Sequence, residues 1–239
     1  MALEALREGE IEIVGRIVAS SNNAMLVSVT RICPDPEPAL VLDAIYKPTL
    51  GERPLDDFPD GTLARREVAA WHVSEATGWG IVPPTILRDG PFGEGMVQAF
   101  VDADTEVDVV AMVVDDDARL RRMTVLDAVM NNTDRKGGHI LPVDGGRHVY
   151  GVDHGVTFSP VPKLRTVLWG WRGQPLGADE VDGLERVRAA LDADLGETLR
   201  ELLSRVEVRA TTRRVDALLA ARRFPYPSPD WPAIPWPPF

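Results

Sequence analysis

The residues best suited to chemistry in this chain of 239 residues lie between positions 126 and 158, where polar loops alternate with short apolar runs. Two of these runs, 139–143 and 148–152, flank a polar four-residue turn, which is typical of a β-hairpin. Such a turn makes residues 143 and 148 the first pair, and counting outward places His139 opposite residue 152. We therefore expect Asp153 to leave the hairpin beside His139.

Asp134 lies in the loop that enters the same end of this hairpin, with Asn132 two residues before it. The sequence therefore predicts that Asp134, His139 and Asp153 converge. Carboxylates that meet on loops beside glycine are typical of a site for a metal ion and a phosphate group. A polar turn followed by an ordinary strand end would contain the same residue types, so that alternative stays open here.

Lys47 and Glu67 form a second candidate pair. Lys47 ends an apolar run at 39–47, and Glu67 shares one helix face with Leu63 and Trp71 in the run 62–77. A carboxylate in an apolar stripe needs a partner, because an unpaired buried charge is costly. Each residue alone has an ordinary explanation, as a strand-end lysine and a helix-edge glutamate. Together, a strand lysine followed about 20 residues later by a helix glutamate is how kinase-type folds hold nucleotide phosphates.

The elements that must position these residues change in type along the chain. The first part is rich in strands and the second part in helices, which predicts an α+β fold with two possible lobes. The predicted strands are 11–19, 24–32, 39–47, 85–88, 95–101 and the hairpin, and the predicted helices are 62–77, 119–130 and the amphipathic region 178–223. Thr62 is the expected N-cap of the first helix and Gly78 its stop. The proline-rich tail cannot be helical, and its aromatic residues favour docking on its own domain over a partner motif.

Composition excludes several classes of protein. With 44% hydrophobic residues the chain can form a core, and its single cysteine, Cys33, excludes an intrachain disulfide and suits the cytoplasm. A net charge of −11 argues against nucleic acid as a partner and against an acidic membrane surface. No apolar run is long enough for a transmembrane helix, and the N-terminus lacks a secretory signal, so we expect no stable membrane insertion.

The motifs AIYKP around Lys47, NNTDRKGGH and VDHG, taken with Glu67, resemble the phosphatidylinositol 3-/4-kinase-like branch of the protein-kinase-like fold. The resemblance covers about residues 11–223 and is greatest to a group from high-GC bacteria. It implies a bilobal α+β fold with an antiparallel-sheet N-lobe that contains one main helix, and a mostly helical C-lobe. The implied boundaries are 1–101 for the N-lobe, 102–223 for the C-lobe and 224–239 for the tail.

The resemblance also implies a role for each matching residue. Lys47 would contact the α- and β-phosphates of ATP and pair with Glu67. Asp134 would act as the catalytic base or orient the attacking hydroxyl, with Arg135 grouped beside it as catalytic, and Asp153 would bind Mg²⁺. The loop Ser20, Ser21, Asn22 and Asn23 would cover the phosphates, and the hinge Gln98, Ala99, Phe100 and Val101 would hold adenine through backbone groups.

Two positions depart from the family pattern. His139 stands where the family usually has an asparagine metal ligand, and imidazole prefers softer ions than Mg²⁺, so Mn²⁺ is an alternative cofactor. Lys136 stands where lipid kinases commonly have histidine, and no polybasic activation segment follows Asp153. These departures favour a hydroxyl of a protein or small molecule as the phosphoryl acceptor over a lipid.

The sequence therefore predicts an ATP-dependent kinase that acts on an alcohol group. A nucleotide-binding pseudokinase or sensor is a second possibility, because His139 replaces the usual ligand. A metal-dependent hydrolase is a third, because His139, His148 and His154 lie close in sequence to Asp134 and Asp153.

Overall fold

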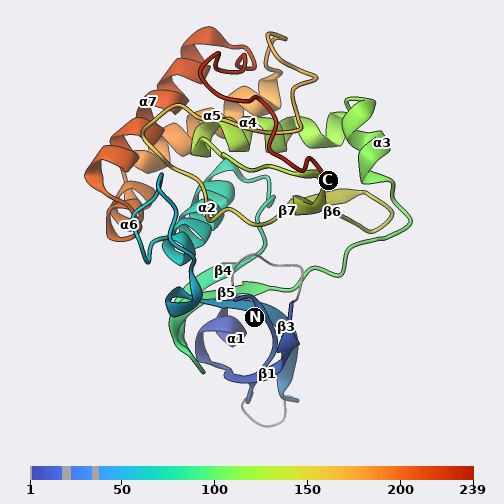
Figure 1. Ribbon diagram of the computed structural model, residues 1–239, viewed down its shortest axis with the longest axis vertical. Coiled ribbons are helices and arrows are strands. Elements are labelled where there is room, and N and C mark those ends of the chain that lie inside the picture. Colours follow the sequence, from blue (N-terminus) through green and yellow to red (C-terminus); the bar gives the residue numbers. More distant parts are fainter. Residues whose placement is uncertain (1, 18–22, 34–37) are drawn as a thin grey trace.

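The computed structural model describes residues 2–17, 23–33 and 38–239, and it places an antiparallel sheet below a larger helical part (Figure 1). The sheet has five strands in the order β1-β2-β3-β5-β4. The strands are β1 (Glu10–Arg16), β2 (Met25–Arg31), β3 (Leu40–Pro48), β4 (Thr85–Gly90) and β5 (Gly93–Ala99). All neighbouring strands are antiparallel, so the predicted strand-rich first part is confirmed.

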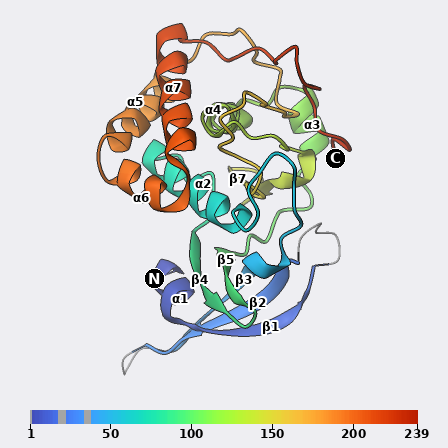
Figure 2. The same cartoon turned by 60° about the vertical axis from the view of Figure 1, so that its left-hand side comes forward.

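A short helix that the sequence analysis did not anticipate covers one face of this sheet. This helix, α1 (Ala2–Glu8), lies against the sheet in Figure 2, and its residues Ala5 and Leu6 are buried. Leu6 packs with alternate residues of β2 and β3, among them Val27 and Tyr46. Seven residues form a marginal helix alone, so tertiary packing rather than local propensity stabilises α1.

The helix predicted over 62–77 is present as α2 (Leu63–Thr77), and it lies between the sheet and the C-terminal helices (Figure 1). Gly78 ends it with a φ of 71°, as predicted. Thr62 is the N-cap residue, as predicted, but its hydroxyl makes no capping bond and donates to the Pro59 carbonyl. The Glu52 carboxylate instead accepts the first two helical N–H groups, at 3.0 and 2.7 Å, and its charge complements the helix dipole.

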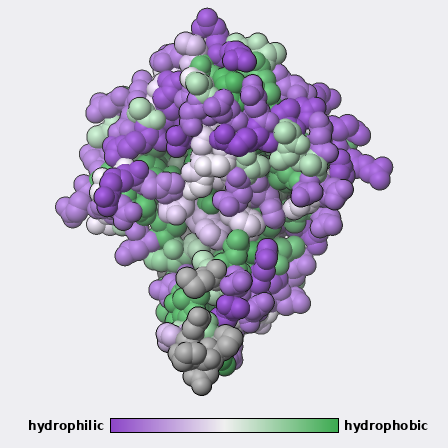
Figure 3. Space-filling model, turned by 180° about the vertical axis from the view of Figure 1, so that it is seen from behind, coloured by the Kyte–Doolittle hydropathy of each residue, from purple (hydrophilic) through white to green (hydrophobic). Residues whose placement is uncertain are grey.

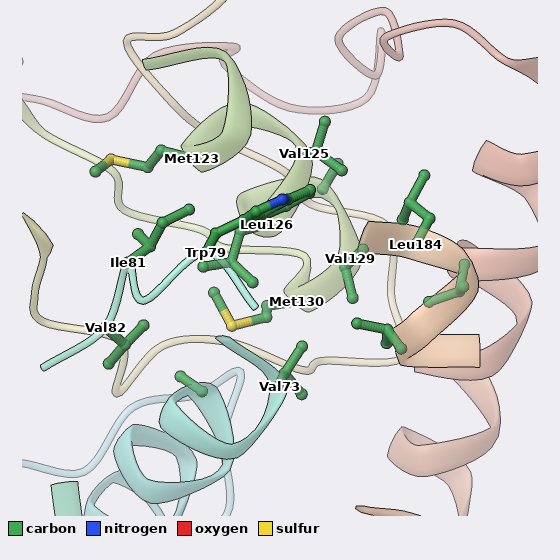
Figure 4. Close-up of a cluster of buried hydrophobic side chains, with 14 of the residues drawn as sticks. Val73, Trp79, Ile81, Val82, Met123, Val125, Leu126, Val129, Met130 and Leu184 are labelled. Carbon is green, nitrogen blue, oxygen red and sulfur yellow. The ribbon is translucent and has the colours of Figure 1, made fainter. Parts of the chain in front are cut away.

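The helical part packs around a core to which α2 contributes. Figure 4 shows Val73 of α2 and the following Trp79, Ile81 and Val82 facing Met123 and its neighbours on α4. The helices of this part are α3 (Val109–Val114), α4 (Arg121–Met130), α5 (Ala178–Leu191), α6 (Asp194–Leu202) and α7 (Arg205–Ala221). Short 3₁₀ turns lie at Thr49–Gly51, Ala118–Leu120 and Gly137–His139. The predicted helical region 178–223 is thus present as three helices with short breaks.

The predicted hairpin has the predicted register. Its strands are β6 (Ile140–Val143) and β7 (His148–Gly151), and Val143 pairs with His148. The Val152 N–H donates to the His139 carbonyl at 3.1 Å, as counting outward from the turn requires. The hairpin therefore places residue 153 beside His139.

The C-terminal tail is not helical and lies on its own domain, which confirms that expectation (Figure 1). The Ala233 carbonyl accepts hydrogen bonds from the Thr166 N–H at 3.0 Å and the Trp169 indole at 2.9 Å. Farther on, the Gly137 N–H donates to the Pro238 carbonyl at 2.8 Å. The tail therefore connects the segment after the hairpin to the loop that carries Asp134.

The surface is in keeping with the acidic composition. Figure 3 shows one face that is mostly hydrophilic, with smaller hydrophobic areas. Within residues 2–17, 23–33 and 38–239, no helix combines the length and the apolar character needed to span a bilayer. The lobe boundaries at residues 101 and 223 stay a prediction.

Candidate active site

Lys47 stands at the end of β3, on the face of the strand opposite to α1. Ala44 and Tyr46 pack toward α1, and by alternation Ile45 and Lys47 face α2. The Lys47 Nζ lies 2.7 Å from Oε1 of Glu67, so the predicted ion pair is present. Burial alone would lower the pKa of Lys47, but Asp153 and Glu67 outweigh it and hold the pKa above its usual value. Lys47 is therefore a fixed positive charge.

Glu67 connects the sheet to the loop after the hairpin. Its side chain is almost fully buried, and its second oxygen, Oε2, accepts the backbone N–H of His154 at 2.8 Å. Burial raises the pKa of Glu67, whereas the charge of Lys47 opposes that rise. One carboxylate thus fixes the lysine and the backbone next to Asp153.

Asp153 is the second carboxylate on Lys47. Its Oδ1 lies 2.8 Å from the Lys47 Nζ, and its Oδ2 lies 3.4 Å from Nε2 of His139. Lys47 holds the pKa of Asp153 well below its usual range, although burial opposes this. The backbone of Asp153 is in the left-handed region, with a φ of 60°, where aspartate is tolerated better than most residues. An ionised, half-exposed carboxylate is the result.

Asp134 lies in the loop between α4 and the hairpin. Its backbone N–H donates to Oδ1 of Asn132 at 3.0 Å, which forms an Asx turn. Its Oδ2 lies 3.1 Å from the Nζ of Lys136. Asp134 also acts electrostatically on His139, which in turn contacts Asp153. The loop and the hairpin end are therefore neighbours, as the sequence predicts.

The resemblance implies a catalytic role for Arg135 beside Asp134, but the buried position of the Arg135 side chain does not fit that role. Its guanidinium is fully buried and forms an ion pair with Asp127 at 2.9 Å. It also donates to the carbonyls of His139, at 3.1 Å, and Val152, at 3.0 Å. These bonds hold the loop and the hairpin together, so Arg135 positions its neighbours instead of meeting a substrate.

Asp127 and Arg66 are structural supports that the sequence analysis missed. Asp127 is fully buried on α4 and also accepts a hydrogen bond from Asn132 at 2.9 Å. The sequence feature that could have revealed Asp127 is its position four residues after Met123, which places a charged residue on an apolar helix face. Arg66 precedes Glu67 and forms a buried ion pair with Glu207 of α7, which fixes α2 against the helical part. No local signal reveals that pair, because 141 residues separate its members.

The three neighbouring histidines do not converge. His148 bonds the Gly80 carbonyl at 2.9 Å, and His154 is buried with its Nε2 2.6 Å from the Arg135 guanidinium. Burial, and then Arg135, lowers the pKa of His154 well below its usual value, so its ring is neutral. Across the described ranges, no three His, Cys, Asp or Glu side chains group as metal ligands. A zinc hydrolase needs three protein ligands, which the described residues do not bring together, so the metal-dependent hydrolase stays an untested alternative.

A nucleotide-bound divalent ion has a different requirement, because it takes most of its ligands from phosphates and water and one or two from the protein. Asp153 fits that requirement, as it is ionised and half-exposed. His139 is the other candidate, and its Nδ1 is buried without a hydrogen-bond partner. Burial lowers the pKa of His139 although Asp153 opposes this, so a neutral imidazole is available.

The other predicted site residues that the structure describes have their recorded contacts away from this centre. The buried Gln98 side chain donates to the Thr85 hydroxyl at 2.8 Å, and the Phe100 N–H donates to the Asp43 carbonyl at 3.0 Å. Val101, just beyond β5, shows no contact with the lysine or the carboxylates. Asn23 packs beside Gly51. Ser20, Ser21 and Asn22 lie outside the described residues. The adenine and phosphate-loop roles stay predictions.

Comparisons with known proteins agree with this geometry at the level of fold. No family model matches the chain. The crystal structure of the proinflammatory kinase CtkA from Helicobacter pylori is similar with a TM-score of 0.53 and 13% identity, covering 91% of this chain and 94% of that one. The structure of hydra Fam20 with sugar is similar with a TM-score of 0.55 and 13% identity, covering 92% of this chain and 86% of that one.

These neighbours share the antiparallel sheet and helical part of the protein-kinase-like fold, which confirms the predicted fold class. A curated relative extends the similarity to sequence. Protein Rv2133c of Mycobacterium tuberculosis is 41% identical over 270 aligned residues, which span 98% of this chain and 94% of the relative. The chain therefore belongs to the family of protein Rv2133c and has a protein-kinase-like fold.

Proposed function

We propose that this protein is an ATP-dependent phosphotransferase, similar in its motifs to the phosphatidylinositol 3-/4-kinases, that transfers the γ-phosphoryl group to a hydroxyl of a protein or small molecule. One observation carries the proposal: the Lys47 Nζ bonds Glu67 at 2.7 Å and Asp153 at 2.8 Å. Phosphoryl transfer needs a fixed cation for the phosphates beside a carboxylate for the metal. This triad supplies both at one point.

Each residue of the triad has a separate task. Glu67 holds Nζ in place from a buried position, and Lys47 exchanges its contact with Asp153 for the α- and β-phosphates of ATP. Asp153, ionised by Lys47, and His139 would hold Mg²⁺ or Mn²⁺. When bound, the ion would neutralise charge on the phosphates of ATP.

Asp134 serves the acceptor. Its carboxylate orients the hydroxyl and receives its proton as the new oxygen–phosphorus bond forms, while the bond from the γ-phosphorus to the bridging oxygen breaks and ADP leaves. Lys136, 3.1 Å from Oδ2 of Asp134, places a positive charge beside the transferred group. Arg135 holds this loop in place through its buried ion pair with Asp127.

The basic residues after the hairpin favour a protein or small molecule over a lipid. Lys163 bonds Asp57, and its Nζ lies 4.3 Å from the centre of the Trp231 ring. Arg165 donates to the Pro232 carbonyl at 3.2 Å. These charges are engaged within the protein and do not form the polybasic surface that binds anionic headgroups.

His139 favours a second candidate, a nucleotide sensor with little turnover. Imidazole is a softer ligand than the asparagine oxygen usual at this position, so Mg²⁺ would be held less well than Mn²⁺. The variant His139→Asn restores the harder ligand. We expect it to raise the Mg²⁺-dependent rate relative to the Mn²⁺-dependent rate.

The test measures release or transfer of the γ-phosphoryl group from labelled ATP with Mg²⁺ and with Mn²⁺. Asp134→Asn should reduce the rate by about 10²- to 10⁴-fold, the usual contribution of a general base, while ATP affinity is unchanged. A matched control, Asp144→Asn in the hairpin turn, should retain full activity. An unchanged rate in Asp134→Asn would overturn its role. ATP binding without turnover, with either metal and in His139→Asn, would favour the sensor.

A further inference from the structure

A cavity lies in the helical part, apart from Lys47 and its carboxylates. It has a volume of about 470 Å³, which is within the range of small-molecule sites. The end of α4, the segment 162–164, the second half of α7 and residues 223–228 line it, and it is open to solvent on one side. Most of its walls are carbon, from side chains such as Ala128, Leu164, Leu218 and Phe224.

The charged residues of this cavity are of one sign. Arg214 and Arg223 line it, and none of the described Asp or Glu residues does. This is unusual in a chain that has 37 acidic residues against 26 basic ones. The cavity therefore combines an apolar wall with positive charge, which complements an anion that carries an apolar body.

Arg214 has no carboxylate partner. It donates from Nε to the Val129 carbonyl at 2.8 Å, from Nη1 to the Ser159 carbonyl at 3.2 Å, and from Nη2 to the Thr211 hydroxyl at 2.9 Å. All three acceptors are neutral, and no ion pair of Arg214 is present among the described residues. A guanidinium has five N–H groups, so one donor remains on each terminal nitrogen.

The surroundings of Arg214 disfavour its charge. Burial, with a smaller contribution from Arg213, lowers the pKa of Arg214 to about 10, and only Glu207 opposes this. Glu207 is already bonded to Arg66. Arg214 is therefore a largely buried cation without a carboxylate in contact, and a bound anion would supply one.

We propose that this cavity binds an amphiphilic monocarboxylate with a single alkyl chain, its carboxylate on Arg214 and its chain along the apolar wall. A carboxylate supplies the negative charge and the acceptors that suit a guanidinium with donors left over. The alkyl chain is removed from water by Leu164, Leu218 and Phe224. The proposal does not depend on the proposed phosphotransferase activity.

The experiment titrates the full chain with decanoate, below its micellar concentration, by isothermal calorimetry. Decan-1-ol, which has the same chain length without the charge, is the matched ligand. We expect decanoate to bind one site and decan-1-ol to bind at least about tenfold more weakly, because hydrogen bonds to charged groups are worth that factor or more. Equal affinity for the two ligands, or no binding of decanoate, would overturn the proposal.

Two variants locate the site. Arg214→Met keeps the apolar bulk and should weaken decanoate binding about tenfold or more. Because Arg214 also supports α4, a second variant, Ala217→Phe, fills the cavity from an exposed position on α7 and should weaken binding equally. Ala220→Phe adds the same ring at an exposed position outside the cavity and should have no effect. Equal binding by Ala217→Phe and Ala220→Phe would place decanoate elsewhere and overturn the proposal.

Discussion

The buried pair between Asp127 and Arg135 gives the sharpest stability prediction. Both side chains are fully buried, and the guanidinium contacts the carboxylate through Nε at 3.0 Å and Nη2 at 2.9 Å. Asp127→Asn keeps the shape of the side chain and removes its charge. It leaves Arg135 as an uncompensated buried cation, with an amide group facing the guanidinium.

The expected magnitude follows from this burial. Removing one partner of a buried ion pair costs about 3 to 5 kcal/mol, whereas an exposed pair is worth less than about 1 kcal/mol. For a chain of this length, each kcal/mol shifts the melting temperature by roughly 2 to 4 °C, so Asp127→Asn should lower it by about 6 to 20 °C. Asp179→Asn removes a carboxylate from the exposed pair with Arg122 and should change little.

The assay is urea denaturation at neutral pH, followed by circular dichroism. Asp127→Asn should lower the free energy of unfolding by the stated amount with an unchanged m-value, because the folded and unfolded surfaces stay the same. A free energy within about 1 kcal/mol of wild type, or equal losses in Asp127→Asn and Asp179→Asn, would refute this reasoning.

Three further predictions concern other parts of the molecule. Burial alone would raise the pKa of Glu207, but its bonds to a serine and an arginine lower the pKa from its usual 4.5, so the carboxylate stabilises the fold only while it is ionised. Glu207→Gln should therefore destabilise the protein at neutral pH. In urea denaturation, this difference from wild type should vanish as the pH falls through and below the folded pKa of Glu207. Gly137→Ala should displace the tail and speed its proteolysis, because the new Cβ would lie 2.0 Å from the ring of Phe239. The control Gly138→Ala adds a Cβ that meets nothing within 4 Å, so it should leave the rate of proteolysis unchanged. Ser74→Ala should lower the melting temperature, because the buried hydroxyl accepts hydrogen bonds from two backbone N–H groups at 3.0 Å. Each N–H would lose its partner, at a cost of about 1 to 3 kcal/mol. A fall in melting temperature no greater than that of Thr198→Ala, which removes an exposed hydroxyl, would contradict this prediction.

The elements that the sequence predicts best are those set by local rules. The length of one turn determined the register of the β6–β7 hairpin, and a strand lysine followed by a helix glutamate indicated the pair of Lys47 and Glu67. The contact between Lys47 and Asp153 joins residues 106 positions apart, and the sequence did not predict it. The ion pair between Arg66 and Glu207 was not predicted either, because no motif links the two residues. The helix α1 was missed because its stability depends on tertiary packing and not on its own seven residues. Arg135 shows the limit of motif transfer, because a motif gives a position but not the direction of a side chain.

The central proposal is that Lys47, Glu67 and Asp153 form a nucleotide and metal site. The most direct test is thermal denaturation with ATP and Mg²⁺, Mn²⁺ or a chelator, for wild type, Lys47→Met and Asp153→Asn, with circular dichroism to establish that each variant is folded. For wild type, ATP at about 100 times its Kd with metal should add about 2.7 kcal/mol of stability, or roughly 5 to 11 °C. The shift should be lost in both variants and, without metal, greatly reduced in wild type. No shift in wild type with either metal, or an equal shift in the variants, would contradict the account.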